Sequence, residues 1–456
     1  MRLKSNRFHF VGIGGIGMCG LAELLKNIGA QVTGSDLTEN ANTDRLKALG
    51  IPIYKGHNAK NIGNAEVVVY SSAINFQNPE IAAARAQLIP LIPRAEALAE
   101  IMRFKRGVAI AGTHGKTTTT SMVASIFLEA NASPTIVVGG RFERIQSTAQ
   151  LGQGEWLVAE ADESDGSFAK LTPEIAIITN IDADHLDYYK TFENLEKAFY
   201  DFSLKIPFYG ELIACGDDPS IRETFKNFPK RVLYYGFRPH NDIVIRGENG
   251  KYELFKNGIS IGAFTLSIPG IHNALNGTAA ILAGLVAGFD FATCAKGLAH
   301  FGGVDRRFHF KGEVAGIKIY DDYGHHPTEV KAVLQAFKEK YPKNKLTVLF
   351  QPHRYSRTLH CWGDFINCFG LADEVLLLDI YSAGETPIPG INSQRLADEI
   401  KHSHCRHFIR TADSAKELVA LAESGQIFLT LGAGDGWKFG MDLLKLLEIK
   451  TLNSDR

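Results

Sequence analysis

The 456-residue chain lacks several features that would place it in a special class of protein. No run of about 18 apolar residues occurs, so we expect no membrane-spanning helix. Lys and Arg number 49 against 50 Asp and Glu, a balance that gives no electrostatic reason to expect nucleic acid or an anionic membrane as partner. Internal repeats, low-complexity tracts and long charge runs are also missing. The 45% hydrophobic content is ordinary for a globular protein, and the length predicts two to four domains.

Cysteine is scarce as well. The six cysteines stand at positions 19, 215, 294, 361, 368 and 405 without any Cys-x-x-Cys pair, which favours free thiols over a disulfide framework or a zinc site. Basic residues near the N-terminus are followed by glycines from Gly12 onward, a pattern that does not fit a signal peptide. We therefore expect a soluble, cytoplasmic protein.

The most informative stretch is AGTHGKTTTT at residues 111–120. An apolar run at 107–111 predicts a buried strand before it, and residues 121–130 predict a helix after it. Backbone N–H groups at such a helix start cradle phosphates, Lys116 adds a charge, and the Thr117 hydroxyl can reach Mg²⁺. The full eight-residue pattern has Gly where this chain has Ile110, so we expect a shortened loop. The predicted ATP site comprises Gly112, Thr113, His114, Gly115, Lys116, Thr117 and Thr118.

A second glycine-rich loop, GIGGIG at residues 12–17, follows a predicted strand at 8–11 and precedes a predicted helix at 21–28. A strand at 31–36 then ends in Asp36. Taken literally, this is a dinucleotide fingerprint with Asp36 as the ribose ligand, but glycines at a helix start favour any nucleotide diphosphate. Further strands at 66–70, leading into Ser71 and Ser72, and at 89–92 predict a small α/β domain that ends near residue 105.

Acidic clusters follow two more predicted strands, at 155–159 and 175–181. The first cluster contains Glu160, Asp162 and Glu163, and the second is DADHLD at 182–187. Functional groups gather beyond the carboxyl ends of parallel strands, so the two clusters together favour Mg²⁺ binding. Asn273 and Asn276 open an Ala-rich helix, where they would either cap the helix or contact a ligand.

From about residue 305, strands predicted at 317–320, 346–350, 374–378 and 427–430 alternate with helical segments, which indicates a third α/β domain. Its loops carry DDYGHHP at 321–327 and QPHRYSRT at 351–358. Four arginines, at 306, 307, 354 and 357, are predicted anion ligands because guanidinium groups match carboxylate and phosphate. The predicted domains are 1–105, 106–304 and 305–456, with a hinge at Gly302-Gly303.

Taken in order, the motifs resemble those of the Mur ligase family over essentially the whole chain. The markers are VGIGGIGM at 11–18, AGTHGKTTTT at 111–120, EADESDGSF at 160–168, TNIDADHLDYY at 179–189, NALN at 273–276, GVDRRF at 303–308, DDYGHHPTE at 321–329, QPHRYSRT at 351–358 and DIYSAGETPIPG at 379–390. So many ordered motifs make the resemblance highly specific.

The resemblance implies three α/β domains: a Rossmann-like UDP-sugar domain, a central P-loop ATPase-like domain with a mostly parallel sheet, and a Rossmann-like amino-acid domain. It also implies an ATP- and Mg²⁺-dependent ligase, monomeric or homodimeric, that joins L-alanine to the carboxylate of UDP-N-acetylmuramate through an acyl phosphate in peptidoglycan precursor synthesis. Attachment of a whole tripeptide is the nearest alternative within the family. An NAD(P)-dependent oxidoreductase, suggested by the first glycine loop alone, leaves the Lys116 loop and the acidic clusters unexplained.

By the same resemblance, each group of residues receives a role. The ATP phosphates contact Lys116, and the metal lies among Thr117, Glu160 and His185, although imidazole is an unusual Mg²⁺ ligand. The nucleotide contacts Asn273, Asn276 and Arg307. Residues expected at the UDP-sugar are Gly12, Gly14, Gly15, Ile16, Gly17, Asp36, His57, Ser71 and Ser72. Residues expected around the amino acid are Asp322, Tyr323, His325, His353, Arg354 and Arg357. Catalytic roles fall to Lys116, Glu160, His185, Asp322 and His353.

Two departures from the family pattern are visible. Cys19 stands where relatives usually have Ser, and the segment Gly434-Asp435-Gly436-Trp437 replaces a usual Ile-containing helix start, so no role is carried onto it. Several Mur ligases use a carbamylated lysine as a metal bridge, and we assign no such lysine here. Selectivity among L-alanine, glycine and L-serine is not fixed by the sequence.

Overall fold

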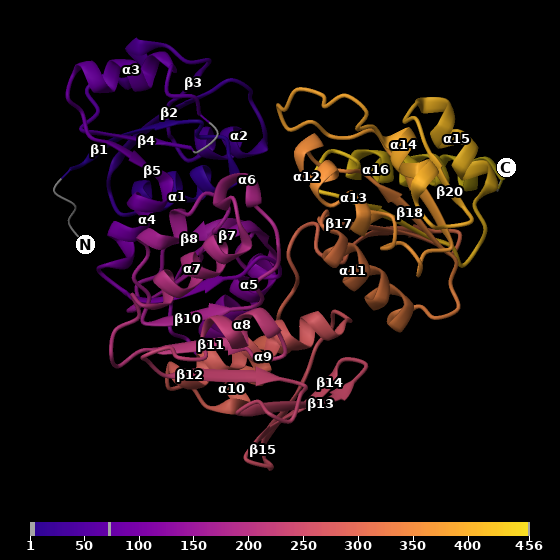
Figure 1. Ribbon diagram of the computed structural model, residues 1–456. Helices are drawn as coiled ribbons and strands as arrows, with labels where there is room; N and C mark the ends of the chain where they lie inside the picture. The colour runs from indigo at the N-terminus through magenta and orange to yellow at the C-terminus, as the bar shows by residue number, and fades with distance from the viewer. Residues whose placement is uncertain (1–4, 72–73, 455–456) are drawn as a thin grey trace. The chain divides into compact units, whose positions relative to one another are not determined.

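The computed structural model describes residues 5–71 and 74–454, which form three mostly parallel β-sheets with helical connections (Figure 1). The predicted α/β class with three sheet-containing domains is confirmed. Residue contacts divide the chain into two compact units. The first comprises Met1–Ser267 and Asn273–Val304, and the second comprises Ile268–His272 and Asp305–Arg456. The domain boundaries inferred from the sequence stay a prediction.

The N-terminal sheet has five parallel strands in the order β3-β2-β1-β4-β5. Its elements are β1 (Arg7–Val11), α1 (Ile16–Asn27), β2 (Gln31–Asp36), α2 (Ala41–Ala48), β3 (Ile53–Lys55), η1 (Ala59–Ile62), β4 (Val67–Tyr70), α3 (Pro79–Ala86), β5 (Leu91–Pro93) and α4 (Arg94–Met102). Helix α1 begins five residues before the predicted start, inside the glycine loop, and β5 begins two residues later than expected. Parallel neighbouring strands need a crossover connection, and α1 connects β1 to β2 in this way. The glycine loop joins β1 to α1 and therefore lies at the carboxyl end of β1.

The central sheet has ten strands in the order β15-β14-β13-β12-β11-β10-β6-β9-β7-β8. Its elements are β6 (Arg106–Ala111), α5 (Lys116–Glu129), β7 (Thr135–Phe142), η2 (Glu143–Ile145), β8 (Ser147–Gln150), β9 (Trp156–Glu160), η3 (Ser167–Lys170), β10 (Ile175–Ile178), α6 (Leu186–Tyr189), α7 (Phe192–Ser203), β11 (Glu211–Cys215), α8 (Pro219–Thr224), β12 (Val232–Gly236), β13 (Ile243–Glu248), β14 (Lys251–Lys256), β15 (Ile259–Thr265), α9 (Ile271–Val286) and α10 (Phe291–Ala299). Strand β6 is flanked by β9 and β10 in parallel register, and antiparallel pairs occur only toward the two edges.

Helix α5 begins at Lys116, five residues before the predicted start at Ser121. The run Thr117–Thr120 is β-branched and disfavours a helix on propensity alone. In the structure these threonines are buried, and the Thr120 hydroxyl donates to the Lys116 carbonyl at 2.8 Å while Ser121 donates to the Thr117 carbonyl at 2.8 Å. Tertiary burial therefore overrides the weak helix propensity, and these local hydrogen bonds satisfy the buried hydroxyl groups.

The C-terminal sheet has six strands in the order β16-β17-β21-β18-β19-β20, all parallel except the β16–β17 pair. Its elements are β16 (His309–Val314), β17 (Ile317–Asp322), α11 (Pro327–Lys340), β18 (Leu346–Phe350), α12 (Tyr355–His360), α13 (Trp362–Phe365), β19 (Glu374–Leu377), α14 (Ser393–Glu399), β20 (Cys405–His407), α15 (Ala412–Leu421), β21 (Ile427–Leu431) and α16 (Trp437–Ser454). Alternate residues of its central strands join two separate apolar clusters, so both faces of this sheet are covered.

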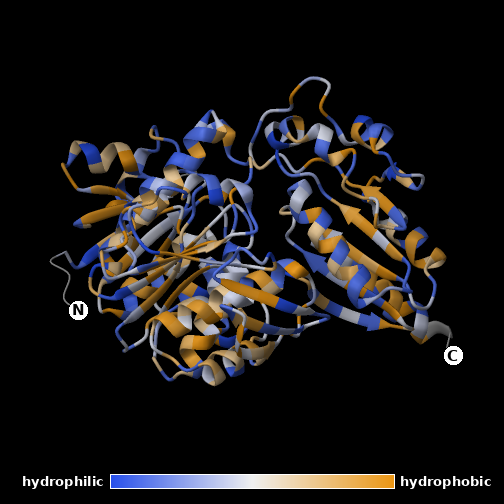
Figure 2. Cartoon of the chain, turned by 60° about the horizontal axis from the view of Figure 1, so that its bottom comes forward, coloured by the Kyte–Doolittle hydropathy of each residue, from blue (hydrophilic) through white to orange (hydrophobic). Residues whose placement is uncertain are grey.

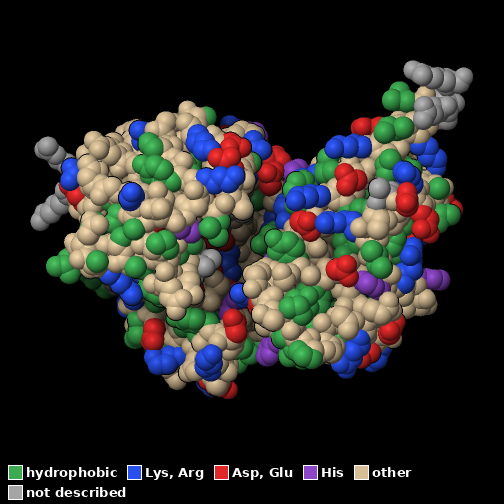
Figure 3. Space-filling view, turned by 90° about the horizontal axis from the view of Figure 1, so that it is seen from above, with side chains coloured by type: hydrophobic (Ala, Val, Ile, Leu, Met, Phe, Trp, Pro, Cys, Tyr) green, Lys and Arg blue, Asp and Glu red, His purple; other side chains and the backbone are tan. Residues whose placement is uncertain are grey.

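Side-chain chemistry agrees with this layering. The central strands of the sheets are largely hydrophobic, whereas the helices carry both hydrophobic and hydrophilic residues (Figure 2). On the face drawn in Figure 3, basic and acidic side chains are interspersed, in keeping with the balanced totals of 49 and 50. The six cysteines are free thiols, as predicted. Across residues 5–71 and 74–454, no helix is long and apolar enough to cross a membrane.

Phe350 offers a test of the packing in the C-terminal sheet. Its side chain is fully buried and packs against Phe365 and Phe369 at ring-centroid distances of 5.4 and 5.2 Å. We predict that Phe350→Ala lowers the free energy of unfolding by about 3–5 kcal/mol, because the cavity cannot fully collapse. Urea unfolding measures this loss. Phe208→Ala is the control, since Phe208 is 93% exposed and its loss should cost less than about 0.5 kcal/mol. Equal losses in both variants would contradict the assigned core.

Candidate active site

The loop between β6 and α5 has a backbone that requires glycine at two positions. Gly112 has φ 130° and Gly115 has φ 80°, values that side chains of L-residues rarely allow. A Cβ atom at Gly112 would also lie 2.0 Å from the Thr179 hydroxyl, so the close approach of two backbones leaves no room for one. The glycines thus set the shape of a tight turn that ends at the start of α5, where the first N–H groups of the helix lie.

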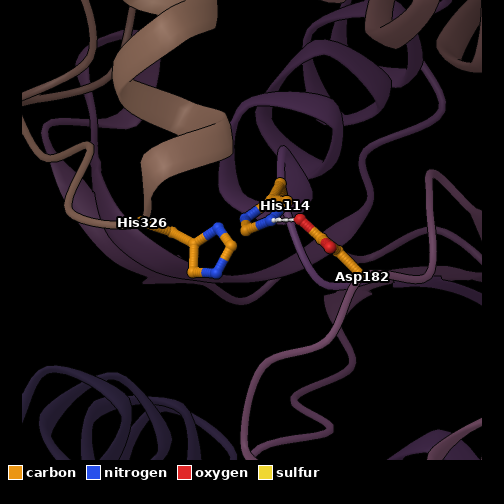
Figure 4. A group of neighbouring side chains, drawn as sticks. All are labelled: His114, Asp182 and His326. Carbon is orange, nitrogen blue, oxygen red and sulfur yellow. Dashed lines mark hydrogen bonds and ion pairs between the residues drawn. The ribbon is translucent and has the colours of Figure 1, made fainter. Parts of the chain in front are cut away.

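The segment after β10 holds this turn in place. Thr179 Oγ1 donates to the His114 carbonyl at 2.6 Å, and the His114 N–H donates to Asn180 Oδ1 at 2.8 Å. The imidazole Nε2 of His114 lies 2.9 Å from Asp182 Oδ2, as Figure 4 shows. His326, also labelled in Figure 4, belongs to the second unit. The TNID segment that the sequence linked to metal binding therefore also forms a scaffold for the phosphate loop.

Lys116 lies inside this loop with its ammonium group surrounded by oxygen. Its Nζ donates to the carbonyls of Gly112 at 2.8 Å and Thr113 at 3.0 Å, and to Glu163 Oε1 at 2.8 Å. Burial acts to lower the pKa of Lys116, but the neighbouring carboxylates, Glu163 first and Asp162 next, outweigh it and the pKa is raised. Lys116 is therefore a fixed positive charge at the helix start.

Glu163 is fully buried beside this charge. Burial raises the pKa of Glu163 to about 7 against the opposing attraction of Lys116. Its second oxygen, Oε2, is buried without a hydrogen-bond partner in the part of the chain that the structure describes. Buried carboxylate oxygens are normally paired, so an unpaired one beside a phosphate loop is typical of a group that awaits a ligand. The sequence placed Glu163 in an acidic cluster but gave no signal that distinguished it from its neighbours.

Two of the three predicted metal ligands lie together. The Thr117 hydroxyl donates to Glu160 Oε1 at 3.1 Å, and the Gly139 N–H donates to Glu160 Oε2 at 2.7 Å. His185 is placed differently: its Nε2 lies 3.7 Å from Glu163 Oε1 and 3.6 Å from Asp184 Oδ2. Among the described residues, neither Glu160 nor His185 belongs to a group of three His, Cys, Asp or Glu ligand atoms within 4.8 Å of one another. A hydroxyl and carboxylate oxygens suit Mg²⁺, which prefers hard donors.

The two asparagines of α9 lie beside the phosphate loop. Helix α9 begins at Ile271, so Asn273 is inside its first turn and does not cap it. Asn276 donates to Asn273 Oδ1 at 3.5 Å, and a Cβ atom on Gly115 would come within 2.8 Å of Asn276 Oδ1. This proximity favours the ligand interpretation of the pair. Thr118 is buried in α5. Arg307 belongs to the second unit, and its predicted contact with the nucleotide stays a prediction.

The N-terminal glycine loop is held from the end of β2. The N–H groups of Gly12 and Ile13 donate to the Ser35 carbonyl at 2.9 and 3.0 Å, and Gly14 N–H donates to Asp36 Oδ2 at 2.9 Å. Asp36 thus orders the loop, which is a role that the dinucleotide pattern does not include. Gly15 caps α1 from the extended region, and Ile16 and Gly17 form its first turn. Ser71 follows β4, whereas Ser72 lies outside the described residues.

Arg94, which the sequence did not single out, lies near both nucleotide loops. A Cβ atom built on Gly17 would come within 2.9 Å of its Nη1, and its Nη2 lies 3.7 Å from Asp162 Oδ2. Arg94 is the first residue of α4. No sequence motif marks it, because its neighbours come from segments that are distant in the chain.

In the second unit, Asp322 is a buried carboxylate at the end of β17. Its Oδ2 accepts from Phe308 N–H at 2.7 Å and its Oδ1 accepts from Gly324 N–H at 2.8 Å. Burial raises the pKa of Asp322 to about 6, although Arg307 and these two hydrogen bonds act in the opposite direction. Asp322 therefore exchanges a proton much closer to neutrality than an ordinary aspartate.

Several aromatic and cationic residues that the sequence predicted around the amino acid lie together in the second unit. The His353 ring stacks on Tyr381 at 5.5 Å and lies 5.8 Å from the His325 ring, which in turn lies 5.4 Å from Tyr323. Arg357 Nη1 lies 3.5 Å from His353 Nδ1. Burial lowers the pKa of His353 to about 3, and the neighbouring cations reinforce the shift, so this imidazole is neutral at pH 7.

The predicted arginine ligands divide into two kinds. Arg306 is committed to the fold: its Nε pairs with Asp321 at 2.9 Å, and its remaining nitrogens donate to carbonyls of Gly432, Ala433 and Gly434. Its prediction as an anion ligand is therefore wrong. Arg354 has φ 69° and precedes α12, whereas Arg357 lies inside that helix, so the two arginines do not share a helical face despite their spacing of three residues. Arg354 Nε instead lies 3.2 Å from Glu385 Oε1.

Comparison with known proteins defines the class. The chain matches the family models described as Mur ligase family, catalytic domain at residues 7–106, Mur ligase middle domain at 110–284, and Mur ligase, glutamate ligase domain at 306–434. Because these matches cover most of the chain in order, the chain belongs to the Mur ligase family. Mur ligases are ATP-dependent, so ATP is a substrate that this chain shares with its family.

Individual relatives narrow the class. The chain is 66% identical over 453 residues to the UDP-N-acetylmuramate–L-alanine ligase of Bdellovibrio bacteriovorus, with 98% of this chain and 100% of that protein covered. It is 49% identical to the protein of the same name from Geobacter sp. (strain M21), with 98% of each covered. The crystal structure of the UDP-N-acetylmuramate-alanine ligase from Thermotoga maritima matches with a TM-score of 0.81 at 29% identity, covering 97% of this chain and 99% of that chain.

A pH-dependent stability follows from Asp322. Its pKa is raised from 3.8 to about 6 in the folded protein, so between these values the folded state holds a proton that the unfolded state has released. With respect to this group, the free energy of unfolding is highest below pH 3.8. It falls by about 3 kcal/mol in total as the pH rises through 6. We predict that wild type loses stability relative to Asp322→Asn by up to that amount between pH 4 and 8.

Urea unfolding of both proteins between pH 4 and 8 measures the difference in their free energies of unfolding. The titration of other groups cancels in this difference because both proteins contain them. A difference that does not change with pH would show that Asp322 titrates normally.

Proposed function

We propose that this chain joins L-alanine to the carboxylate of UDP-N-acetylmuramate with hydrolysis of ATP to ADP and phosphate, in the synthesis of peptidoglycan precursors. The observation that carries the proposal is the buried, charged Lys116 within a glycine turn at a helix start, in a chain 66% identical over its length to a ligase of that name. Such a turn binds phosphate groups, and Lys116 adds charge where the γ-phosphate would lie.

The reaction needs an activated carboxylate, because an oxygen of a free carboxylate is a poor leaving group. A muramoyl carboxylate oxygen attacks the γ-phosphorus and ADP departs, which leaves an acyl phosphate. The amine nitrogen of L-alanine then attacks the acyl carbon, and phosphate departs from the tetrahedral intermediate. Lys116 and the N–H groups at the start of α5 would stabilise charge on the transferred phosphoryl group, where electrostatics and positioning supply most of the catalysis.

Thr117 and Glu160 would hold Mg²⁺, and the unpaired oxygen of buried Glu163 supports a ligand next to them. When bound, the ion would neutralise charge on the phosphate oxygens. His185 would bind the same metal ion from the loop after β10. Its Nε2 lies 3.7 Å from Glu163 Oε1, and its backbone is in the left-handed region at φ 57°. Residues with such a strained backbone conformation are common at ligand-binding and catalytic sites.

The second unit would bind L-alanine. Arg354 and Arg357 would hold its carboxylate through paired N–H donors, and Tyr323 and His325 would line the side-chain pocket. The amine must lose a proton before it attacks. Neutral His353 and Asp322, whose pKa is about 6, are the two groups suited to accept that proton.

The remaining assignments complete the proposal. The glycine loop at 12–17, with Asp36, His57, Ser71 and Ser72, would bind the UDP-sugar; Gly112–Thr118, Asn273, Asn276 and Arg307 would bind ATP. Domains at 1–105, 106–304 and 305–456 would bind the UDP-sugar, ATP and the amino acid in that order. We propose a cytoplasmic enzyme, monomeric or homodimeric.

A second candidate acceptor is a tripeptide. The structure of a murein peptide ligase from Psychrobacter arcticus shares the fold with a TM-score of 0.72 at 23% identity. Phosphate release measured with ATP, UDP-N-acetylmuramate and either L-alanine, glycine, L-serine or a tripeptide separates these functions. The proposal expects release that depends on L-alanine. Release with the tripeptide alone would replace it, and no release with any acceptor would refute both.

Lys116 is the residue on which catalysis should depend most. We predict that Lys116→Ala folds, because Glu163 can take a proton once its partner is gone, but turns over about 10²–10³-fold more slowly. Phosphate release under saturating substrates measures the loss, with circular dichroism as the folding check. Lys197→Ala, which removes a surface lysine with 69% side-chain exposure, is the control and should retain wild-type turnover. Near-normal turnover of folded Lys116→Ala would contradict the assigned phosphate site.

Arg357 should matter for one substrate only. We predict that Arg357→Lys raises the apparent KM for L-alanine about tenfold or more, since loss of a charge-assisted pair of hydrogen bonds costs about 1.5–3 kcal/mol. The constants for ATP and UDP-N-acetylmuramate should stay within about twofold in steady-state kinetics with each substrate varied in turn. Arg395→Lys, which changes an exposed arginine of α14, is the matched control. A change confined to ATP or UDP-N-acetylmuramate would move the amino-acid site elsewhere.

A further inference from the structure

Next to the N-terminal glycine loop lies a buried polar cluster that includes His57 and whose central residue has no assigned role. Its centre is Glu80 in α3, whose side chain is fully buried. Glu80 Oε1 accepts from Asn61 Nδ2 at 2.6 Å and from Asn58 N–H at 3.2 Å. Glu80 Oε2 accepts from the Ser35 hydroxyl at 2.5 Å and lies 3.4 Å from both His9 Nε2 and His57 Nδ1. A buried carboxylate needs several donors, and four are present: His9 in β1, Ser35 in β2, and Asn58 and Asn61 in the segment after β3.

The ionisation state of Glu80 follows from these partners. Burial acts to raise the pKa of Glu80, but the hydrogen bonds from His9, Ser35 and Asn61 outweigh it and lower the pKa to about 2. Glu80 is therefore a carboxylate that can only accept hydrogen bonds. The groups that hydrogen-bond to Glu80 must therefore donate their hydrogen atoms to it.

This constraint fixes the direction of the next hydrogen bond. Ser35 has one hydroxyl hydrogen, which it donates to Glu80. The Ser35 oxygen lies 2.9 Å from His57 Nδ1, and because its hydrogen is already used, it can only accept there. His57 Nδ1 must therefore carry a hydrogen. In the neutral imidazole, the other nitrogen, Nε2, then carries the lone pair.

His57 lies on the ligand side of the sheet. The residue follows β3, at the carboxyl ends of the parallel strands, where ligands of such sheets bind. Within residues 5–71 and 74–454, its hydrogen bond and its ion pair both involve Nδ1, and its side chain keeps 9% of its surface exposed. Ser35 also connects His57 to the glycine loop, since the Ser35 carbonyl accepts from Gly12 and Ile13.

We propose that Glu80 is a positioning residue that acts through Ser35 to fix His57 in the Nδ1–H form, so that Nε2 accepts a hydrogen bond from the uridine part of the UDP-sugar. The inference rests on the proposed function, which places the UDP-sugar at this loop. The matching donors on the ligand are the ribose hydroxyls and the uracil N3–H. A cytosine ring has an acceptor at N3 in place of this N–H and carries its donor on the exocyclic N4 instead.

Substitutions in the cluster separate this role from a structural one. Ser35→Ala removes the relay hydroxyl but keeps the carbonyl that holds the glycine loop. We expect Ser35→Ala, Glu80→Gln and His57→Ala each to raise the KM for UDP-N-acetylmuramate about threefold to tenfold, with kcat and the KM values for ATP and L-alanine within about twofold. Thr33→Val is the matched control, because the Thr33 hydroxyl pairs with His9 Nδ1 at 2.8 Å and its loss leaves the Ser35–His57 contact in place.

A double substitution tests whether the three residues act through one another. If Ser35 acts through His57, adding Ser35→Ala to His57→Ala should raise the KM no further. Independent, multiplying effects, or an equal effect of Thr33→Val, would show a merely structural role and overturn the proposal. If wild type does not release phosphate with UDP-N-acetylmuramate at all, the proposed function fails; normal turnover with an unchanged KM in Ser35→Ala rejects only the role of this cluster.

Two further measurements need no change to the cluster. Nitrogen NMR of the wild-type enzyme labelled at histidine, with His57→Ala to assign the signal, should show the Nδ1–H tautomer at pH 8; the Nε2–H tautomer would overturn the proposal. Substrate analogues that lack a ribose hydroxyl or carry an N3-methyl uracil identify the donor. Each analogue should have a higher KM than the natural substrate if it lacks the donor. The analogue whose KM increase disappears in His57→Ala lacks the group that Nε2 recognises. KM increases that all persist in His57→Ala would reject a direct contact.

Discussion

The glycine turn between β6 and α5 depends on one buried ion pair, between Lys116 and Glu163. A lysine inside the protein is tolerated only if nearby oxygens compensate its charge, and here two backbone carbonyls and one carboxylate do so. These groups meet because β6 is paired with β9 on one side and β10 on the other. The glycine turn follows β6, the acidic cluster follows β9, and the segment that holds His114 follows β10. The sheet order therefore brings together three loops that carry one site.

The first unit uses the same construction twice. In the N-terminal sheet the glycine loop follows β1, and the end of the adjacent β2 holds it through Ser35 and Asp36. In the central sheet the glycine turn follows β6, and the adjacent β10 holds it through Thr179 and Asn180. In both cases hydrogen bonds to the end of a neighbouring strand fix the loop backbone before a ligand arrives, so binding needs little rearrangement of the loop.

The second unit shows how burial prepares proton chemistry. Asp322 and His353 are both shifted toward their neutral forms because both are buried, with a pKa of about 6 for the first and about 3 for the second. A neutral imidazole beside cationic Arg357 can accept a hydrogen bond from an ammonium group without adding charge to the cluster. An amine must be deprotonated before it attacks, and groups whose environments separate their pKa values are suited to that task.

The sequence by itself determined the α/β class, the positions of the buried strands and both glycine loops, because strand periodicity and glycine turns are local properties. It placed β2 and β18 at the residues that the structure gives. Only the tertiary structure decided that α5 begins at Lys116, that Asp36 orders a loop, and that Arg306 clamps carbonyls more than 120 residues away. It alone singled out Glu163 and Glu80 among fifty acidic residues. The physical reason is that a buried charge is defined by its partners, and packing, which no local pattern records, chooses those partners.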